Sequence, residues 1–359
     1  MLNKTASLAL FIILAAGCKD GPCPDKSSFI GGDPGRNTKQ WCEKQMPSGR
    51  IVKDGPFIAW HTATQKKSEG QYKGGLKEGK WTYYFKNGQK SAEGVFKQNK
   101  RDGKWTDWYP NGNKKLEGLY KDGARVGFWL AWYKNGQMKD KGEWTNGKGA
   151  GHWTYWYNNG SLRAEGQRDA KNKIGQWTYY HKNGQKNEAG SYKEGKRDGV
   201  WEYWSKTGVL TMKGPWKNDQ KDGFWTRWYD NGKQKSEGTW KDGKQTGKWT
   251  TWYENGQIRS IGEKTEGQRT GTWVFYHENG KKSQEGVFEE NTPKDGMKYW
   301  DEEGKKTDGP VRREKLSSTI GEDGDETSSG KPADLPKKTA EPHQVGPAPE
   351  PKTSAVESK

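Results

Sequence analysis

The hydrophobic pattern of this chain repeats every 24 residues. A Gly-x-Trp-x-x-[Trp/Tyr] motif recurs without insertion and places its tryptophan at Trp81, Trp105, Trp129, Trp153, Trp177, Trp201, Trp225, Trp249 and Trp273. The same register puts Phe57 and Met297 at the motif position of one further unit at each end. A fixed period of this length indicates a repeat array, so we expect about eleven units over residues 55–309.

Each unit has the sequence features of a β-hairpin. The segment that starts at the motif tryptophan is rich in aromatic and β-branched residues, as in residues 249–253, and this favours a strand. An Asn-Gly pair such as Asn87-Gly88 follows in eight units and predicts a type I′ turn. A Lys-Asp-Gly turn, as at residues 121–123, then leads into the next unit as an antiparallel neighbour.

Glycine recurs at three positions of the unit. The glycine two residues before the motif tryptophan, such as Gly79, and the turn glycine, such as Gly88, indicate positive φ angles. A third glycine, such as Gly94, falls in the middle of the second strand. We expect a neighbouring aromatic ring to cover its bare backbone.

These features predict an all-β fold, an elongated open antiparallel β-meander of about eleven 24-residue repeats. Two strands per unit would advance the array by about 10 Å per repeat. Hydrophobic residues make up only 28% of the chain and the mean hydropathy is −1.30, too little aliphatic material for a layered core. Aromatic stripes should therefore carry the stability. Degenerate end units favour an open array over a closed propeller.

The N-terminal segment predicts export. An apolar run over residues 8–16 follows Lys4, and we interpret residues 1–17 as a signal peptide. The run ends in Gly17-Cys18, which resembles a bacterial lipobox, so Cys18 is expected to carry the lipid anchor. Lys19 after the anchor implies export to the outer membrane of a diderm cell. A simple secretory signal is the alternative.

The flanks of the array differ from it in composition. Residues 18–54 are expected to be a linker between the lipid anchor and the array. Cys23 and Cys42 lie within this segment, and export places them in a compartment that permits disulfides, so we expect the two cysteines to pair. Residues 310–359 are rich in Pro, Ser, Glu and Lys and lack aromatic residues, which predicts a disordered tail.

The net charge of +17 lies mainly in the array, where residues 55–309 hold 47 basic and 32 acidic side chains. Basic charge mixed with aromatic residues is one pattern that binds nucleic acid. Export argues against that partner, and lysines in turns also keep sheet edges soluble. We therefore expect no nucleic acid, and attraction to acidic partners or anionic lipid head groups stays open.

The sequence predicts no enzyme, cofactor or metal site. No nucleophile elbow, zinc-binding helix, P-loop or Cys-x-x-Cys framework is present. His61, His181 and His277 share the position four residues after the motif residue, where Tyr is usual, and lie four or five units apart. About 40 Å or more would separate them, so each should only replace a ring. The glutamate column that includes Glu69 and Glu93 should be a solvated face.

The unit Tyr-Lys-x-Gly-x-x-x-Gly-x-Trp-x-x-Trp-Tyr-x-Asn-Gly-Gln, at residues 120–137, resembles the MORN-variant repeat of the YwqK-type antitoxin family. The resemblance covers the array. It implies an elongated β-array that binds another protein, a toxin in that family's label, and so a non-enzymatic scaffold at the cell envelope.

A second class of function is open from the sequence. The Trp-Tyr-x-Asn-Gly rhythm is also similar to cell-wall repeats that bind choline or glucan, and this makes carbohydrate or peptidoglycan the alternative ligand. Exposure of the rings separates the two hypotheses. The residue two after the motif tryptophan varies from Tyr83 to Asp107 to Ala131, so we expect this column to face a partner or solvent.

Overall fold

The computed structural model describes residues 23, 24 and 27–310, and every regular element among them is a β-strand. The strands are β1 (Ser27–Ile30), β2 (Lys39–Gln45), β3 (Ile51–Trp60), β4 (Lys66–Lys73), β5 (Leu76–Tyr84), β6 (Lys90–Lys97), β7 (Lys100–Trp108), β8 (Lys114–Lys121), β9 (Ala124–Trp132), β10 (Met138–Thr145), β11 (Lys148–Trp156), β12 (Leu162–Asp169), β13 (Asn172–Tyr180), β14 (Lys186–Lys193), β15 (Lys196–Arg197), β16 (Gly199–Trp204), β17 (Leu210–Lys217), β18 (Gln220–Lys221), β19 (Gly223–Trp228), β20 (Gln234–Lys241), β21 (Lys244–Trp252), β22 (Ile258–Thr265), β23 (Gln268–Tyr276), β24 (Lys282–Glu289), β25 (Thr292–Pro293), β26 (Lys298–Trp300) and β27 (Lys306–Thr307).

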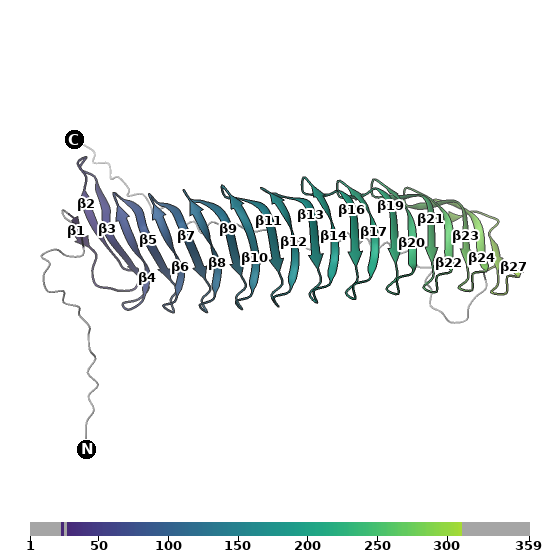
Figure 1. Cartoon of the computed structure of the whole chain (residues 1–359), viewed down its shortest axis with the longest axis horizontal. Helices are drawn as coiled ribbons and strands as arrows, with labels where there is room; N and C mark the ends of the chain where they lie inside the picture. The colour runs from purple at the N-terminus through teal and green to yellow at the C-terminus, as the bar shows by residue number, and fades with distance from the viewer. Residues whose placement is uncertain (1–22, 25–26, 311–359) are drawn as a thin grey trace, which may run out of the picture. The chain divides into compact units, whose positions relative to one another are not determined.

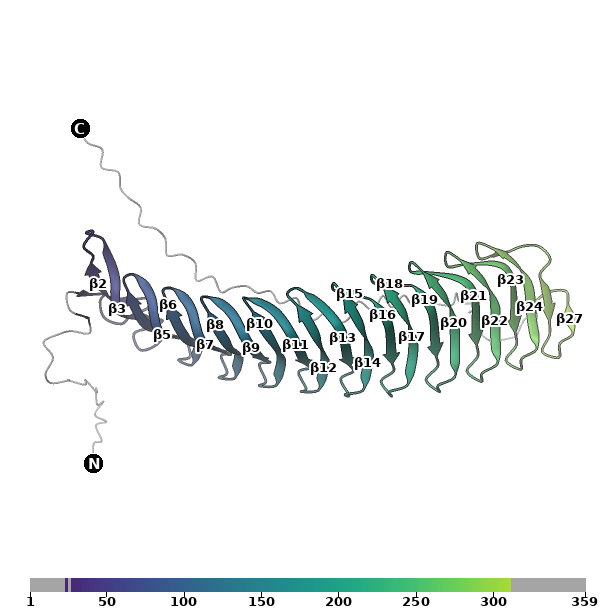
Figure 2. The same ribbon diagram turned by 45° about the horizontal axis from the view of Figure 1, so that its top comes forward.

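The strands form one open antiparallel meander, as the repeat pattern predicts. Neighbours in sequence pair with each other from β1 to β14, and the same order continues to β27. Short segments such as β15 and β16 both pair with β14, because a bulge interrupts what would otherwise be one strand. Figures 1 and 2 show the hairpins in a single row, with the strands crossing the long axis of the sheet.

The Asn-Gly turn is not the predicted type I′ turn. In a type I′ turn both central residues have positive φ, but only Gly88 does so in the Asn87-Gly88 pair. The Gly88 amide donates to the Phe85 carbonyl at 3.0 Å, and the Phe85 amide donates to the Gln89 carbonyl at 2.8 Å. This pattern is a type I turn followed by a glycine bulge. Asn87 uses its side chain instead, and its Oδ1 accepts from the Gln89 amide at 3.1 Å.

Type I′ geometry occurs at the other edge of the sheet, between units. Asp122 and Gly123 have φ angles of 50° and 85°, and Gln98 and Asn99 have 49° and 65°. Both turns contain two residues, between β8 and β9 and between β6 and β7. The right-handed twist of adjacent strands favours this turn in a two-residue loop.

The pairing register of the strands explains why glycine recurs at fixed positions of the unit. Gly94 lies opposite Trp81 on one side and Trp105 on the other. The indole of Trp105 lies over Gly94 so closely that a Cβ there would be 2.2 Å from the ring, as expected for aromatic cover of a bare glycine. The glycine two before the motif tryptophan, such as Gly103, has positive φ and sits at the bulge where the register shifts.

Side-chain ladders join successive units along the Asn-Gly edge. The Asn87 amide donates to the Pro110 carbonyl at 2.8 Å, and Asn111 repeats the bond to Lys134. The Tyr133 hydroxyl donates to the Trp156 carbonyl at 2.8 Å. Each bond spans 23 residues, so every unit is tied to the next by its turn as well as by its strands.

The sheet begins before the first expected unit. Strand β2 lies in the segment that we interpreted as a linker, and its Trp41, the tryptophan outside the repeat register, pairs with Phe57. A disulfide joins Cys23 to Cys42, which is buried in β2. Cys18, the signal peptide and the tail lie outside the described residues.

Candidate functional site

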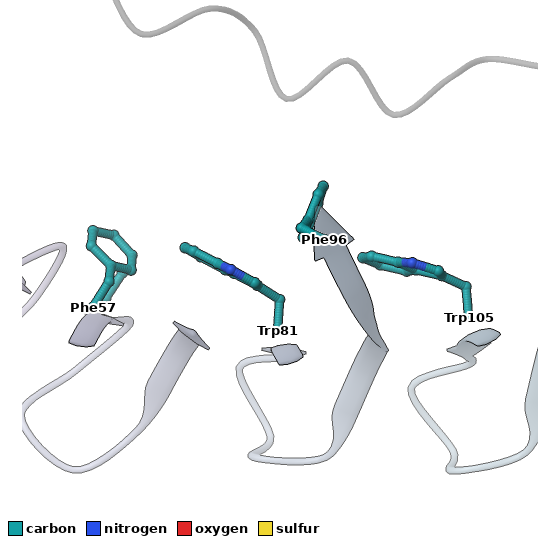
Figure 3. Close-up of a cluster of buried hydrophobic side chains, with 5 residues drawn as sticks. Phe57, Trp81, Phe96 and Trp105 are labelled. Atoms are coloured by element: carbon teal, nitrogen blue, oxygen red, sulfur yellow. The ribbon is translucent and has the colours of Figure 1, made fainter. Parts of the chain in front are cut away.

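The sheet has two faces, which differ in chemistry. The indole face carries the motif tryptophans, and the reverse face carries the residues on either side of them, such as Lys80 and Thr82. Six motif tryptophans are among the largest fully buried side chains, with Trp81 and Trp177 at 1% and 0% exposure. Figure 3 shows Trp81 and Trp105 lying flat on the strands with Phe96 between them. The rings therefore form a core one side chain deep.

Residues two after the motif tryptophan complete this core, which corrects our expectation that they face a partner or solvent. The ring of Tyr155 stacks between Trp153 and Trp177, with centroids 5.9 and 6.2 Å away. Tyr179 lies in the same way between Trp177 and Trp201. The column varies because stacked rings can be replaced by small buried side chains, as at Ala131, and not because it is free to change.

A cation lies over the ring of each of the nine motif tryptophans, a feature that we did not predict. Its charged group is between 4.2 and 5.4 Å from the ring centroid. The pairs are Lys77 with Trp81, Arg101 with Trp105, Arg125 with Trp129, Arg168 with Trp153, Lys173 with Trp177, Arg197 with Trp201, Lys221 with Trp225, Lys264 with Trp249 and Arg269 with Trp273. The signal in the sequence is Lys or Arg four residues before the motif tryptophan in seven of nine units.

Two units lack Lys or Arg four residues before the motif tryptophan and obtain the cation from another position. Gly149 and Gln245 occupy that position in these units. In these units the cation comes from Arg168 or Lys264, on the following strand, at a position that elsewhere holds a ring such as Tyr120. These two units thus retain a cation over the indole, although it comes from a different position in the unit. This is expected if the cation contributes about 0.5–2 kcal/mol to the stability of the unit.

One buried polar cluster interrupts the aromatic core. Arg197 lies 3.7 Å from Glu188, and both side chains are almost fully buried. Burial raises the pKa of Glu188, against the opposing effect of Arg197. The Arg197 guanidinium donates to the Tyr203 hydroxyl at 3.2 Å, and the hydroxyls of Tyr179 and Tyr192 are 3.0 Å apart. The cluster satisfies its own polar groups, which is the arrangement of a structural ion pair.

Carboxylates on the reverse face are held by lysines. Glu93 lies 2.7 Å from Lys90 and 3.2 Å from Lys80. Burial opposes ionisation of Glu93, but the hydrogen bonds from these lysines outweigh it and lower the pKa of the carboxyl group. Glu117 repeats the arrangement with Lys114 and Lys104. At these positions the glutamates are therefore paired with lysines, and their charge is neutralised locally.

A second aromatic row runs along the reverse face, three residues after the motif position. Its members are half-buried and include Trp108, Trp132, Trp156, Trp204, Trp228 and Trp252. Each lies opposite a long side chain of the next strand, as Trp132 does opposite Met138 and Trp156 opposite Leu162. These rings, and not the motif tryptophans, are accessible to a ligand.

Two groups of exposed apolar side chains lie on the reverse face. The first consists of Val95, Leu119 and Phe128, the last 58% exposed. The second consists of Val200, Phe224 and the half-buried Pro215, which pairs directly with Val200 across β16 and β17. Val200 and Phe224 are each 54% exposed. No element among the described residues packs over them.

The histidines lie where the sequence places them, far apart along the array. The Nε2 atoms of His181 and His277 lie 2.9 Å from the carbonyls of Trp204 and Trp300, the bond that Tyr133 makes through its hydroxyl. Among the described residues no group of three or more His, Cys, Asp or Glu side chains is arranged to hold a metal. That part of the chain also contains no helix long and apolar enough to cross a membrane.

Comparison with protein families supports the repeat assignment. Six segments match the MORN repeat variant. They are residues 77–98, 101–122, 151–169, 197–218, 245–263 and 269–290. Each segment spans most of one hairpin of the array, as residues 77–98 span β5 and β6, so these hairpins are similar to that repeat. No curated protein matches the chain.

Solved structures resemble the chain only weakly. The crystal structure of TcdB2-TccC3-TEV aligns with 73% of this chain and 17% of its own, at 12% identity and a TM-score of 0.17. The crystal structure of TcdB2-TccC3 aligns with 74% of this chain and 17% of its own, at 11% identity and a TM-score of 0.17. The chain thus spans less than a fifth of the length of these proteins.

Proposed function

We propose that the array is a non-enzymatic scaffold that binds a protein partner on its reverse face. The observation that carries the proposal is the pair of apolar groups around Phe128 and Phe224. Both lie on the reverse face, and large exposed apolar side chains gathered on one surface are typical of protein contact sites. The repeat core holds the two groups in fixed positions, several units apart.

The experiment is site-specific photo-crosslinking of the full-length protein in its own cells. A photoreactive residue replaces Phe128, Phe224 or, as a control on the exposed turn edge, Lys148. We expect one discrete protein adduct from both phenylalanine positions and none from Lys148. Loss of that adduct in a Phe128→Ser/Phe224→Ser variant with an unchanged melting profile would support the site. Equal labelling from all three positions would reject it.

We further propose that the scaffold acts at the cell envelope, anchored through Cys18, and that its partner is a toxin. The support is the resemblance to the antitoxin family and the lipobox-like sequence before Cys18. Metabolic labelling with a palmitate analogue should mark the wild type and not a Cys18→Ala variant. Growth protection against a co-expressed, crosslinked partner tests the antitoxin role.

The alternative is a cell-wall binding module, and the second aromatic row favours it specifically. Half-buried rings at one per repeat could stack on the sugars of a polysaccharide. Binding of the purified protein to peptidoglycan, lost in a Trp132→Ala/Trp156→Ala variant and retained in the Phe128→Ser/Phe224→Ser variant, would favour this function over the first.

A further inference from the structure

The indole face carries an uninterrupted row of four cations at its N-terminal end. Lys53, Lys77, Arg101 and Arg125 occupy the same position in four consecutive units, and Gly149 ends the row. Lys53 lies 5.1 Å from the Phe57 ring, and the other three lie 4.2 to 4.4 Å from their motif tryptophans. Stacking on the rings therefore fixes the place of each charge.

These cations form the outer layer of the face. Trp81 and Trp105 are 1% and 2% exposed although no second sheet covers them in the described part of the chain. Lys77 and Arg101 lie over these rings and are themselves partly exposed. A molecule approaching the indole face thus meets ammonium and guanidinium groups before it meets the rings.

Acidic side chains next to the row in sequence are used elsewhere. Asp54 accepts from the Gly74 amide at 2.7 Å and Glu78 accepts from the Gln98 amide at 2.9 Å, each in the turn of the following unit. Asp107 and Asp140 lie on the indole face of this stretch and have contacts of their own. On the reverse face, by contrast, carboxylates such as Glu93 lie within ion-pair distance of lysines.

The cations also act on each other. Burial, together with the positive charges of Arg101 and Lys53, lowers the pKa of Lys77 to about 8. Successive members of the row therefore repel each other, and at the N-terminal end Glu43, which lies opposite Lys53, offsets part of that charge. An anion along the row would relieve that repulsion at each site.

The spacing of the row selects for an extended chain. Two strands separate successive cations, which gives about 10 Å per repeat. An extended polypeptide advances about 3.3 Å per residue, so about three residues span one repeat. An acidic residue at every third position would meet one cation at each step. Every third side chain lies on the same face of a polyproline II segment, which has three residues per turn and advances about 3.1 Å per residue, so we expect the segment to bind in that conformation and not as a β-strand.

We propose that Lys53, Lys77, Arg101 and Arg125 bind an extended acidic segment of a partner protein, with one carboxylate per repeat. Lys77 and Arg101 already donate to the hydroxyls of Tyr83 and Tyr120, at 2.8 and 3.1 Å. Each site thus offers one cation with part of its donors free, which suits a single-charged carboxylate. Phosphate sites gather several donors around each group. This surface is separate from the apolar groups of the reverse face.

The experiment measures binding of synthetic peptides to the intact protein by fluorescence anisotropy. The first peptide has about ten residues with Asp at every third position, and the second has the same composition with its Asp residues adjacent. Arg101→Gln is compared with Lys104→Gln, which removes the same charge from the reverse face, and with Arg101→Lys. Melting curves for each variant show whether the repeat core is intact.

We expect the spaced peptide to bind and Arg101→Gln to weaken it about tenfold, with Lys104→Gln within about twofold of wild type and Arg101→Lys retaining most of the affinity. Equal affinity for the two peptides would overturn the register. Equal losses in Arg101→Gln and Lys104→Gln would show a general charge effect and overturn the site. Binding of inorganic polyphosphate through Arg101 without peptide binding would assign the row to a phosphate polymer instead.

Discussion

Trp105 lies flat against Gly94, and the distance from an added Cβ to its ring would be only 2.2 Å. The relationship recurs with Trp81 over Gly70 and Trp177 over Gly166. At the C-terminal end Met297 takes the place of the indole and lies over Gly286. A large ring and a missing side chain on adjacent strands together make a buried core from a single sheet.

Gly94→Ala should therefore destabilise the protein. A rigid indole that bonds the Val95 carbonyl at 2.9 Å cannot move aside without losing that bond, so we expect a loss of about 1–3 kcal/mol in the free energy of unfolding. Gly286→Ala is the matched control, because the flexible Met297 side chain can rotate away. Chemical denaturation of both variants checks this, and an equal cost at the two sites would show that the ring is not the cause.

Trp177→Ala should be among the most costly single substitutions. The ring is fully buried between Tyr155 and Tyr179, and its removal leaves a cavity that a one-layer core cannot refill. We expect a loss of about 3–5 kcal/mol and a broadened transition, since units couple only to their neighbours. His181→Ala in the same unit removes one bond to the Trp204 carbonyl and should cost about 1 kcal/mol. Thermal melts that coincide for wild type and Trp177→Ala would contradict the core assignment.

Removal of the Cys23–Cys42 disulfide should loosen only the N-terminal end. The bridge closes a loop of 19 residues and attaches the chain to β2, so its contribution is about 3 kcal/mol in the chain-entropy description. In a Cys23→Ala/Cys42→Ala variant, hydrogen exchange should accelerate in β2 and β3 and stay unchanged in β13. Uniform acceleration along the array would show that the units are coupled over a longer range than their contacts suggest.

Binding of the acidic peptide should weaken as the pH rises above about 8, where Lys77 loses its charge. The groups that face Lys77 are the cations Lys53 and Arg101 and the Tyr83 hydroxyl. Burial raises the pKa of Tyr83, so Lys77 loses its proton at a lower pH than Tyr83 does. A Lys77→Arg variant keeps its charge at this pH and should bind without that loss. Anisotropy titrations from pH 7 to 9 compare the two proteins, and a parallel decline would exclude Lys77 as the cause.

The lowered pKa of Lys77 affects the stability of the protein in the opposite direction to peptide binding. The pKa of Lys77 is lower in the folded protein than its ordinary value of 10.5, so between about pH 8 and 10.5 the unfolded chain binds more protons. Stability attributable to this group should therefore rise over that interval. Wild type should gain on Lys77→Arg in the free energy of unfolding as the pH is raised from 8 to 10, measured by denaturation at each pH.

The repeat period and the residue types at each position determined the strands, their order and the open meander. Trp81, Gly94 and the turn glycine are local signals, because φ preference and strand propensity act over a few residues. The same signals misplaced the type I′ turn. The Asn-Gly pair permits two hairpin geometries, and only the strand register decided for the type I turn with a glycine bulge at Gly88.

Tertiary structure alone decided what lies on each face and what covers it. The variable column that includes Ala131 and Tyr155 looked like a surface in the sequence, but stacking between tryptophans two strands apart buries it. The cation over Trp153 comes from Arg168, fifteen residues later, because pairing brings the following strand beside it. Contacts of this kind depend on register and on the direction of each side chain, which no short stretch of sequence contains.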